Sequence, residues 1–364
     1  MAWKVLKTRV TPIGVDLGTA TLKLAQLRQA QGQLELAAAA RAEMPQPCRN
    51  DEGKRMKFLA ERLNGLLKEK PFKGRQCIIS LPAASTFVQH VRIGKMPPEQ
   101  LGTALRFELE GKLPFDSADA IIRHVVAGEL RGDPHASLEV IVLAASRQVV
   151  ESYLKLAQHA KLELIGLNVE PCAIVQCFAR LFKRAEDANQ VTLFLDLGQA
   201  VTQVVIVRGP HMVFARNVMF GAEQIDEAAA AATGMSAAQV SQIRQNVHNA
   251  SEAAPEAEKV YAAVTKALGS LLEEVTKCLR YFESTFPSSR ADRVVFLGGQ
   301  ALDRRLCQMM AQRLNLPAQI GDPFARIGQA GGMELDNGPD RRQTQPAWAV
   351  AVGLSLGQQP SQAA

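Results

Sequence analysis

The feature of this sequence that most constrains its fold is a motif that occurs twice. Residues 12–27 read PIGVDLGTATLKLAQL, and residues 191–207 read VTLFLDLGQAVTQVVIV. Each segment predicts an apolar strand, an Asp-Leu-Gly turn and a second strand of alternating polarity. The aspartates, Asp16 and Asp196, are 180 residues apart in a chain of 364, which is almost half its length. We therefore predict a duplicated fold with two lobes, each of which contains one of these hairpins.

Between and after the two hairpins, the apolar periodicity alternates between strand and helix. Strands that alternate with helices indicate an α/β fold. The predicted strands cover 76–81, 87–93, 121–130, 138–145, 162–169 and 293–297, and the predicted helices cover 54–69, 97–112, 147–160, 170–184, most of 222–286, 302–314 and 347–356.

The same pattern predicts the division of the chain into parts. We expect a basic N-terminal segment, two lobes with a subdomain inserted in each, and a flexible C-terminal tail. In order, these are the segment 1–12, the first lobe 13–190 with an inserted α+β subdomain at about 92–165, the second lobe 191–356 with a helical subdomain at about 222–290, and the tail 357–364.

Composition excludes several classes of protein. Aromatic residues make up 5% of the chain, which argues against binding nucleic acid by base stacking. No apolar run reaches the roughly 18 residues of a membrane-spanning helix, and the basic start lacks the apolar stretch of a secretory signal. The six cysteines have no metal-binding spacing and suit reduced thiols in the cytosol. We expect a cytoplasmic protein that does not bind nucleic acid.

The net charge of +6 is unevenly distributed. Residues 1–9 carry three basic side chains and no acid, and residues 49–75 carry nine basic against four acidic side chains. Such a stretch suits an anionic surface, such as the inner leaflet of a membrane, and it equally suits a solvated helix face. The sequence leaves both interpretations open.

The paired turns have the chemistry of a polyphosphate site. Glycines at 18 and 198 let a phosphate approach the backbone, and Thr19, Thr21 and Thr202 add hydroxyl donors. Asp16 and Asp196 suit Mg²⁺ held through its water molecules. The Gly298-Gly299 pair after an apolar strand offers a third close approach, suited to an adenosine group.

The order of four motifs resembles the actin-like ATPase superfamily. DLGTAT, VEPCA at 169–173, DLGQAVT and FLGGQAL at 296–302 are similar to its phosphate-1, connect-1, phosphate-2 and adenosine motifs, and EVTK at 274–277 resembles its ribose- and base-contacting Glu-x-x-Lys. The resemblance implies a ribonuclease H-like fold with two lobes, ATP and Mg²⁺ between them, Asp16 and Asp196 at the metal, and Glu170 positioning water. The implied cofactor-binding residues are Asp16, Gly18, Thr19, Ala20, Thr21, Lys23, Asp196, Gly198, Gln199, Ala200, Thr202, Gly221, Glu274, Lys277, Gly298, Gly299 and Gln300.

Within that superfamily, nearly the whole chain is similar to the type IV pilus assembly protein PilM family. The segments that carry this resemblance are 95–115, 140–164, 214–221, 273–286 and 351–354. The resemblance implies a scaffold of the pilus inner-membrane assembly complex, located in the cytoplasm and recruited to the inner membrane by its partner.

The partner implied by this resemblance is a PilN-like membrane protein, and pilus motor ATPases are possible further partners. The N-terminal cytoplasmic tail of the PilN-like protein would lie in a groove lined by residues near 72–115 and 160–170. Its apolar candidates are Phe87, Val91, Leu105 and Leu109, which are also typical of an ordinary core.

ATP turnover is expected to be slow or absent, because no second general base accompanies Glu170. Glu170 also suits a plain helix N-terminus. Three other relatives remain as alternatives. A cell-division actin relative would carry a basic amphipathic tail, a type II secretion relative would continue into a membrane span, and a sugar kinase of the same fold would need a general-base aspartate.

Overall fold

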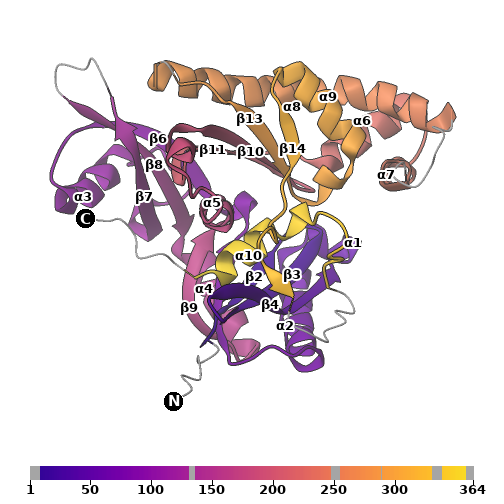
Figure 1. The fold of residues 1–364 in the computed structure, drawn as a ribbon, viewed down its shortest axis with the longest axis horizontal. Helices are drawn as coiled ribbons and strands as arrows, with labels where there is room; N and C mark the ends of the chain where they lie inside the picture. Colours follow the sequence, from indigo (N-terminus) through magenta and orange to yellow (C-terminus); the bar gives the residue numbers. More distant parts are fainter. Residues whose placement is uncertain (1–8, 131–135, 247–254, 288, 330–337, 358–364) are drawn as a thin grey trace.

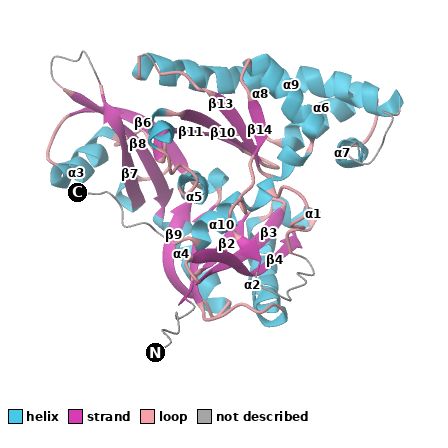
Figure 2. Ribbon diagram, in the orientation of Figure 1, coloured by secondary structure: helices cyan, strands magenta, loops and turns pink. Residues whose placement is uncertain are grey.

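The computed structural model describes residues 9–130, 136–246, 255–287, 289–329 and 338–357. Two mixed sheets form two lobes, and a third, three-stranded sheet with one helix lies to one side (Figure 1). Helices lie over the sheets and between the two lobes (Figure 2). Residues 1–8 of the N-terminal segment expected at 1–12, and residues 358–364 of the tail expected at 357–364, lie outside the described residues.

The two main sheets share one topology. In the first sheet, β4 (Gln33–Glu43), β3 (Thr21–Ala30) and β2 (Ile13–Leu17) are antiparallel, and β5 (Gln76–Leu81) and β9 (Glu163–Val169) continue parallel to β2. The second sheet repeats this order with β12 (His211–Val218), β11 (Thr202–Arg208), β10 (Val191–Leu197), β13 (Arg293–Leu297) and β14 (Ala318–Ile320). The two Asp-Leu-Gly hairpins, β2–β3 and β10–β11, occupy equivalent places. Two short strands, β1 (Arg9–Val10) and β15 (Gly328–Gln329), add to the first sheet.

Two short helices cross between the lobes, and small residues let them approach closely. These are α5 (Glu170–Ala179) and α10 (Ala349–Ser355). A Cβ atom at Gly353 would lie 1.9 Å from the carbonyl oxygen of Ala173, and one at Gly14 would lie 2.1 Å from that of Ala351. Because no side chain fits at either position, glycine is what permits α10 to contact both α5 and β2.

The third sheet belongs to a subdomain inserted between β5 and β9. Its strands are β6 (Phe87–Gly94), β8 (Ser137–Ser146) and β7 (Ala120–Glu129), in that order, and α3 (Pro98–Glu108) packs on it. The sheet thus spans 87–146. The chain then returns through α4 (Arg147–His159), which packs in the apolar core of the first lobe, to β9 in the first sheet.

A polar cluster joins this inserted sheet to the second lobe. The Glu139 side chain on β8 has no exposed surface, and its Oε1 atom accepts hydrogen bonds from Tyr281 Oη at 2.7 Å and lies 2.9 Å from His90 Nδ1. Arg92 lies 3.4 Å from the other carboxylate oxygen. The His90 ring stacks on Phe214 of β12 with 4.5 Å between the centroids. The inserted sheet is therefore fastened to the second lobe as well as covalently joined to the first.

The helices of the second lobe surround its sheet. Its helical part comprises α6 (Ala222–Thr233), α7 (Ala237–Asn246) and α8 (Pro255–Thr285), and α9 (Arg304–Leu314) follows β13. The remaining helices are α1 (Gln46–Arg49) and α2 (Glu52–Glu69) in the first lobe. Across the described residues, none of the helices combines the length and apolar character needed to cross a membrane.

Candidate functional site

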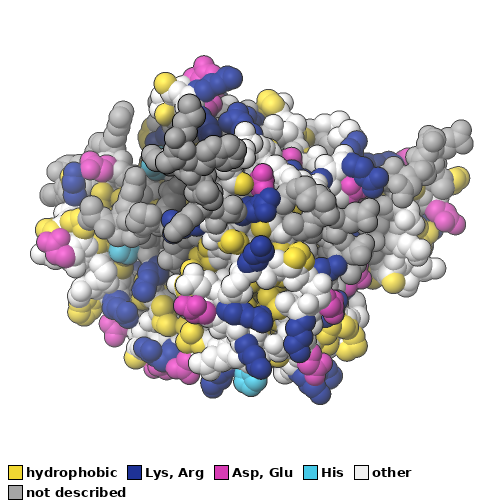
Figure 3. All heavy atoms as spheres, turned by 60° about the horizontal axis from the view of Figure 1, so that its bottom comes forward, with side chains coloured by type: hydrophobic (Ala, Val, Ile, Leu, Met, Phe, Trp, Pro, Cys, Tyr) yellow, Lys and Arg dark blue, Asp and Glu magenta, His cyan; other side chains and the backbone are white. Residues whose placement is uncertain are grey.

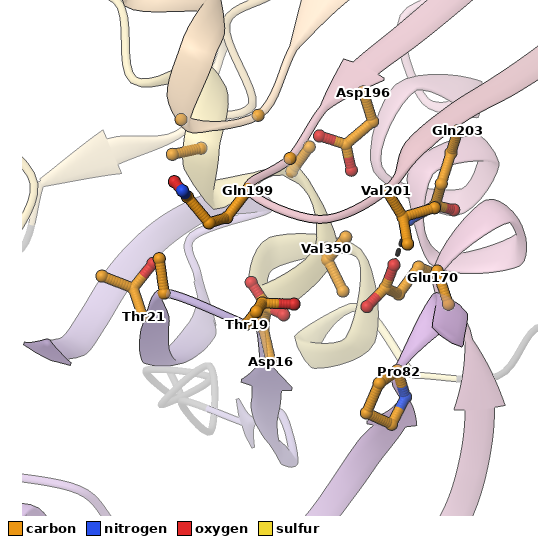
Figure 4. A pocket seen from close by; sticks show the side chains of 18 of the residues that line it. Asp16, Thr19, Thr21, Pro82, Glu170, Asp196, Gln199, Val201, Gln203 and Val350 are labelled. Atoms are coloured by element: carbon orange, nitrogen blue, oxygen red, sulfur yellow. Dashed lines mark hydrogen bonds between the residues drawn. The ribbon is translucent and has the colours of Figure 1, made fainter. Parts of the chain in front are cut away.

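A cleft opens between the two lobes where the Asp-Leu-Gly turns face each other. Thr19 and Thr21 approach it from the first turn and Gln199 from the second, with Asp16, Asp196 and Glu170 around its floor (Figure 4). Its empty volume of about 770 Å³ includes the part that is open to solvent.

The first turn is held from two sides. Asp16, the residue before the last one of β2, pairs with Lys23 of β3, and the Lys23 ammonium lies 3.1 Å from Asp16 Oδ2 with both side chains largely buried. Arg55 on α2 donates to the carbonyl oxygens of Leu17 at 2.5 Å and Gly18 at 3.2 Å. Because Arg55 binds two of its carbonyl oxygens, the backbone of this turn is held in one conformation beside the cleft.

The second turn rests on the start of α6. The first backbone N–H groups of that helix, at Ala222 and Glu223, donate to the carbonyl oxygens of Gly198 and Gln199 at 3.1 and 2.9 Å. Gly221 packs against this turn, since a Cβ there would lie 2.5 Å from the Gln199 carbonyl oxygen. Gly221 thus supports the turn and does not line the cleft.

The third contributor is the loop after β13. Gly298 has φ +83°, and a Cβ there would lie 2.3 Å from Asp196 Oδ1. Only glycine adopts this conformation readily, so the loop can lie directly against Asp196. Gly299 and Gln300 continue it along the wall of the cleft.

Glu170, the first residue of α5, completes a group of three carboxylates with Asp16 and Asp196. Gln203, opposite Asp196 on β11, donates a very short hydrogen bond to Glu170. Burial, and then the nearby Asp16 and Asp196, raise the pKa of Glu170 well above its ordinary value. Burial and Asp16 likewise raise the pKa of Asp196 from 3.8 to about 7, although Lys23 opposes the shift.

This electrostatic balance fits a bound divalent cation. Lys23 is the cation that opposes both pKa shifts, so the ionised site carries excess negative charge that a metal ion would neutralise. Within the described ranges, no three His, Cys, Asp or Glu side chains lie close enough to ligate one metal together. The arrangement fits Mg²⁺, which keeps several water molecules and needs few carboxylates.

Most of the residues implied by the sequence line this cleft. They are Asp16, Gly18, Thr19, Ala20, Thr21, Lys23, Glu170, Asp196, Gly198, Gln199, Gly298, Gly299 and Gln300. Thr202 is buried and donates to the carbonyl oxygen of Phe220 at 2.7 Å, so it fastens the hairpin. Ala200 is likewise not among the lining residues.

The Glu-x-x-Lys pair lies elsewhere. Glu274 and Lys277 form an ion pair with each other at 2.7 Å on α8, and Glu274 also lies 3.6 Å from Arg216 of β12. Neither residue lines the cleft. Their contacts in the structure are with each other and with Arg216.

The four apolar candidates for the peptide groove belong to the core of the inserted subdomain. Leu105 and Leu109 have no exposed surface, Val91 is 7% exposed, and Phe87 packs beside them half-buried. They hold α3 against the sheet. A side chain without exposed surface cannot contact a peptide unless the subdomain opens.

Several lining residues were not identified from the sequence. Pro82, Ala83 and Ala84 directly follow β5, and Val201 and Gln203 belong to the second hairpin. Pro346 and Ala347 lie in the 3-10 turn that precedes α10, and Ala349 and Val350 are the first residues of α10. The first group had a usable signal, because β5 is parallel to β2 and both strands end at the same sheet edge. The residues at 346–350 had no such signal, because only tertiary packing brings this part of the chain to the cleft.

The sequence matches a known protein family over almost its whole length. The family model described as "Type IV pilus assembly protein PilM" matches residues 14–359. The chain belongs to the PilM family. This membership favours pilus assembly over the cell-division, secretion and sugar-kinase alternatives.

Solved structures confirm the actin-like fold of this PilM family member. A structure titled "PilM-PilN type IV pilus biogenesis complex" is 22% identical, with a TM-score of 0.79, and the alignment covers 96% of this chain and 98% of that chain. The ethanolamine utilization protein EutJ from Carboxydothermus hydrogenoformans is 13% identical with a TM-score of 0.54, covering 96% and 90%. MreB5 of Spiroplasma citri bound to ADP is 11% identical with a TM-score of 0.50, covering 95% and 94%.

Proposed function

We propose that this PilM family member binds ATP with Mg²⁺ between its lobes and serves as a scaffold of the pilus inner-membrane assembly complex. Its partner would be the N-terminal cytoplasmic tail of a PilN-like membrane protein. The observation that carries the proposal is the family match over residues 14–359, together with a cleft whose walls come from both Asp-Leu-Gly turns. The neighbours bound to PilN and to ADP support the two ligands separately.

The nucleotide phosphates would lie between the two turns. Backbone N–H groups and the hydroxyl groups of Thr19 and Thr21 would bind them, with Mg²⁺ near Asp16 and Asp196. The cation would supply neutralising charge to phosphates and carboxylates alike. The loop at Gly298–Gln300 would hold the adenosine end.

Glu170 is the candidate for orienting water, but its surroundings favour slow hydrolysis. Its raised pKa favours the protonated carboxyl group, and a protonated carboxyl cannot accept the proton of an attacking water. The bond from Gln203 also occupies one of its oxygens. We therefore propose that ATP acts mainly by holding the lobes together.

Calorimetric titration tests the nucleotide site. Wild type should bind ATP more tightly with Mg²⁺ than with EDTA, and Asp16→Ala and Asp196→Ala should each lose this difference. Asp119→Ala, which removes an exposed aspartate of the inserted subdomain, is the matched control. If both cleft variants fold and retain full Mg²⁺-dependent affinity, the turns do not form the site.

For the partner peptide, we propose the outer edge of β9 and the adjacent surface of α4. β9 is the last strand of the first sheet, and within the described part of the chain no strand pairs with its outer edge. Ile165 on β9 is 47% exposed, and Leu154 on α4 is 41% exposed. An open strand edge beside exposed apolar side chains suits an extended peptide, which adds main-chain hydrogen bonds to side-chain contacts.

The family resemblance implies a peptide groove between the first lobe and the inserted subdomain, so removal of this subdomain is a second test of the groove. Fluorescence titration of the tail of the organism's PilN-like protein should give weaker binding to a variant in which residues 87–146 are replaced by a short linker. Equal affinity for both folded proteins would place the peptide outside this groove.

The same proposal accounts for location. A cytoplasmic protein with this groove would reach the inner membrane through its partner. Lys and Arg side chains spread over the face of the first lobe turned toward the viewer in Figure 3, and could add about 1 kcal/mol each near anionic lipid. Pilus motor ATPases are the further partners that the family suggests.

A further inference from the structure

One buried charged cluster in the second lobe ends at the wall of the cleft. Arg244 of α7 is 2% exposed, and its guanidinium bonds Asp226 of α6 at 2.5 Å and Asp303, which begins α9, at 3.0 Å. Its third bond goes to Gln300 Oε1 at 2.9 Å. Gln300 lines the cleft, whereas Arg244 lies behind it.

The cluster is held rigidly from the side away from the cleft. Tyr261 Oη of α8 donates to Asp303 at 2.8 Å. Arg305 stacks over the Tyr261 ring at 4.4 Å and forms a two-pronged pair with Glu258, both bonds being 2.7 Å. Side chains from α6, α7, α8 and α9 therefore fix the position of the Arg244 guanidinium.

The chemistry of arginine decides how Gln300 is oriented. A guanidinium has donors and no acceptor, so only the carbonyl oxygen of the Gln300 amide can face it. The amide NH₂ group is then the end left for the cleft. Within the described residues this NH₂ group donates no hydrogen bond, so the wall of the cleft presents a pre-oriented donor.

We propose that Arg244 is a positioning residue for nucleoside recognition: it turns Gln300 so that the amide N–H donates to an acceptor on the base or ribose of the nucleotide. This inference rests on the proposed function, because it assigns a role within the same ATP site. The phosphate clamp at the two Asp-Leu-Gly turns does not involve either residue. Arg244 should thus affect binding of the nucleoside and leave binding of the phosphates unchanged.

The test compares two ligands, ATP and inorganic tripolyphosphate, each with Mg²⁺, by calorimetry on the full chain. The variants are Gln300→Leu, Arg244→Lys and the double variant, with Arg304→Lys, at an exposed position of α9, as a control that lies outside the cluster. Loss of one hydrogen bond corresponds to a roughly three- to tenfold weaker affinity. Gln300→Leu and Arg244→Lys should each weaken ATP by this factor and leave tripolyphosphate unchanged.

The double variant separates positioning from simple stabilisation. If Arg244 acts through Gln300, adding Arg244→Lys to Gln300→Leu should not change the ratio of ATP to tripolyphosphate affinity any further. A further change in that ratio, or equal weakening of both ligands, would overturn the inference while leaving the ATP site intact. Failure of wild type to bind ATP would overturn the proposed function and this inference together. If Arg244→Lys does not fold, Gln300→Leu still decides, because unchanged ATP affinity in that variant contradicts the proposal.

Discussion

Replacing Asp196 by Asn should stabilise the protein without ligand at high pH and abolish the Mg²⁺ dependence of ATP binding. The pKa of Asp196 is raised from 3.8 to about 7, first by burial and then by Asp16. The folded state therefore binds more protons than the unfolded state between these values, and wild-type stability falls as pH rises through this range. The full shift corresponds to at most about 4 kcal/mol at pH 8. Because Asp196 is only partly buried, water in the cleft should reduce this figure.

Urea denaturation in EDTA, without nucleotide, measures the effect. Between pH 5 and pH 8, the stability of Asp196→Asn relative to wild type should rise by about 1–3 kcal/mol, since Asn cannot ionise. Asp119→Asn, which removes an exposed carboxyl group, should show no comparable rise and serves as the control.

A difference in stability that does not depend on pH would refute the reasoning, because it would mean that Asp196 is ionised at little cost in the folded protein. Addition of Mg²⁺ and ATP provides the second arm. They should stabilise wild type at pH 8 and have much less effect on Asp196→Asn, whose neutral side chain cannot attract the cation.

Three further predictions concern packing, docking and turnover. Gly353→Ala should destabilise the protein by about 3 kcal/mol or more in urea denaturation, because its Cβ would lie 1.9 Å from the Ala173 carbonyl oxygen. Gly102→Ala, at an exposed position of α3, should not destabilise it. Glu139→Ala removes the fully buried carboxylate that contacts His90 and Tyr281, so the free energy of unfolding should fall by about 3–5 kcal/mol and hydrogen exchange in β6 and β8 should increase. Unchanged exchange would show that the inserted sheet docks by other contacts. Steady-state ATP hydrolysis should stay below about 1 s⁻¹, the lower end of ordinary enzyme rates, and faster turnover would contradict the account of Glu170.

The sequence predicted the parts of the fold that depend on local pattern and repetition. The two hairpins and the α/β alternation follow from strands and turns whose signals lie within a few residues, whereas the actin-like fold was implied by the resemblance of the ordered motifs to that superfamily. The predicted ends of segments were less accurate. The helix expected to end at 112 ends at Glu108, and the chain after it turns at Gly111, which has φ +71°, before Pro114. The expected helix at 170–184 ends at Ala179.

For the site, motif order predicted the two turns that face the cleft but could not identify residues that reach the cleft only through tertiary packing. Gln203 lies beside Glu170 because β11 runs antiparallel to β10, and Arg55 reaches the first turn from α2. Conversely, Glu274 matched a motif, but the orientation of α8 turns it toward Arg216. Side-chain identity at a matching position does not fix the direction in which a long helix presents it.

The most direct test of the central claim is binding of the partner tail to surface variants of the first lobe. Fluorescence anisotropy with a labelled N-terminal peptide of the organism's PilN-like protein should give at least tenfold weaker affinity for Ile165→Asp and Leu154→Asp, because a charge would replace an exposed apolar contact. Met219→Asp, on a residue that is 62% exposed in the second lobe, should bind as wild type does. Equal binding by all four proteins would contradict the proposed groove, and no binding by wild type would contradict the scaffold function itself.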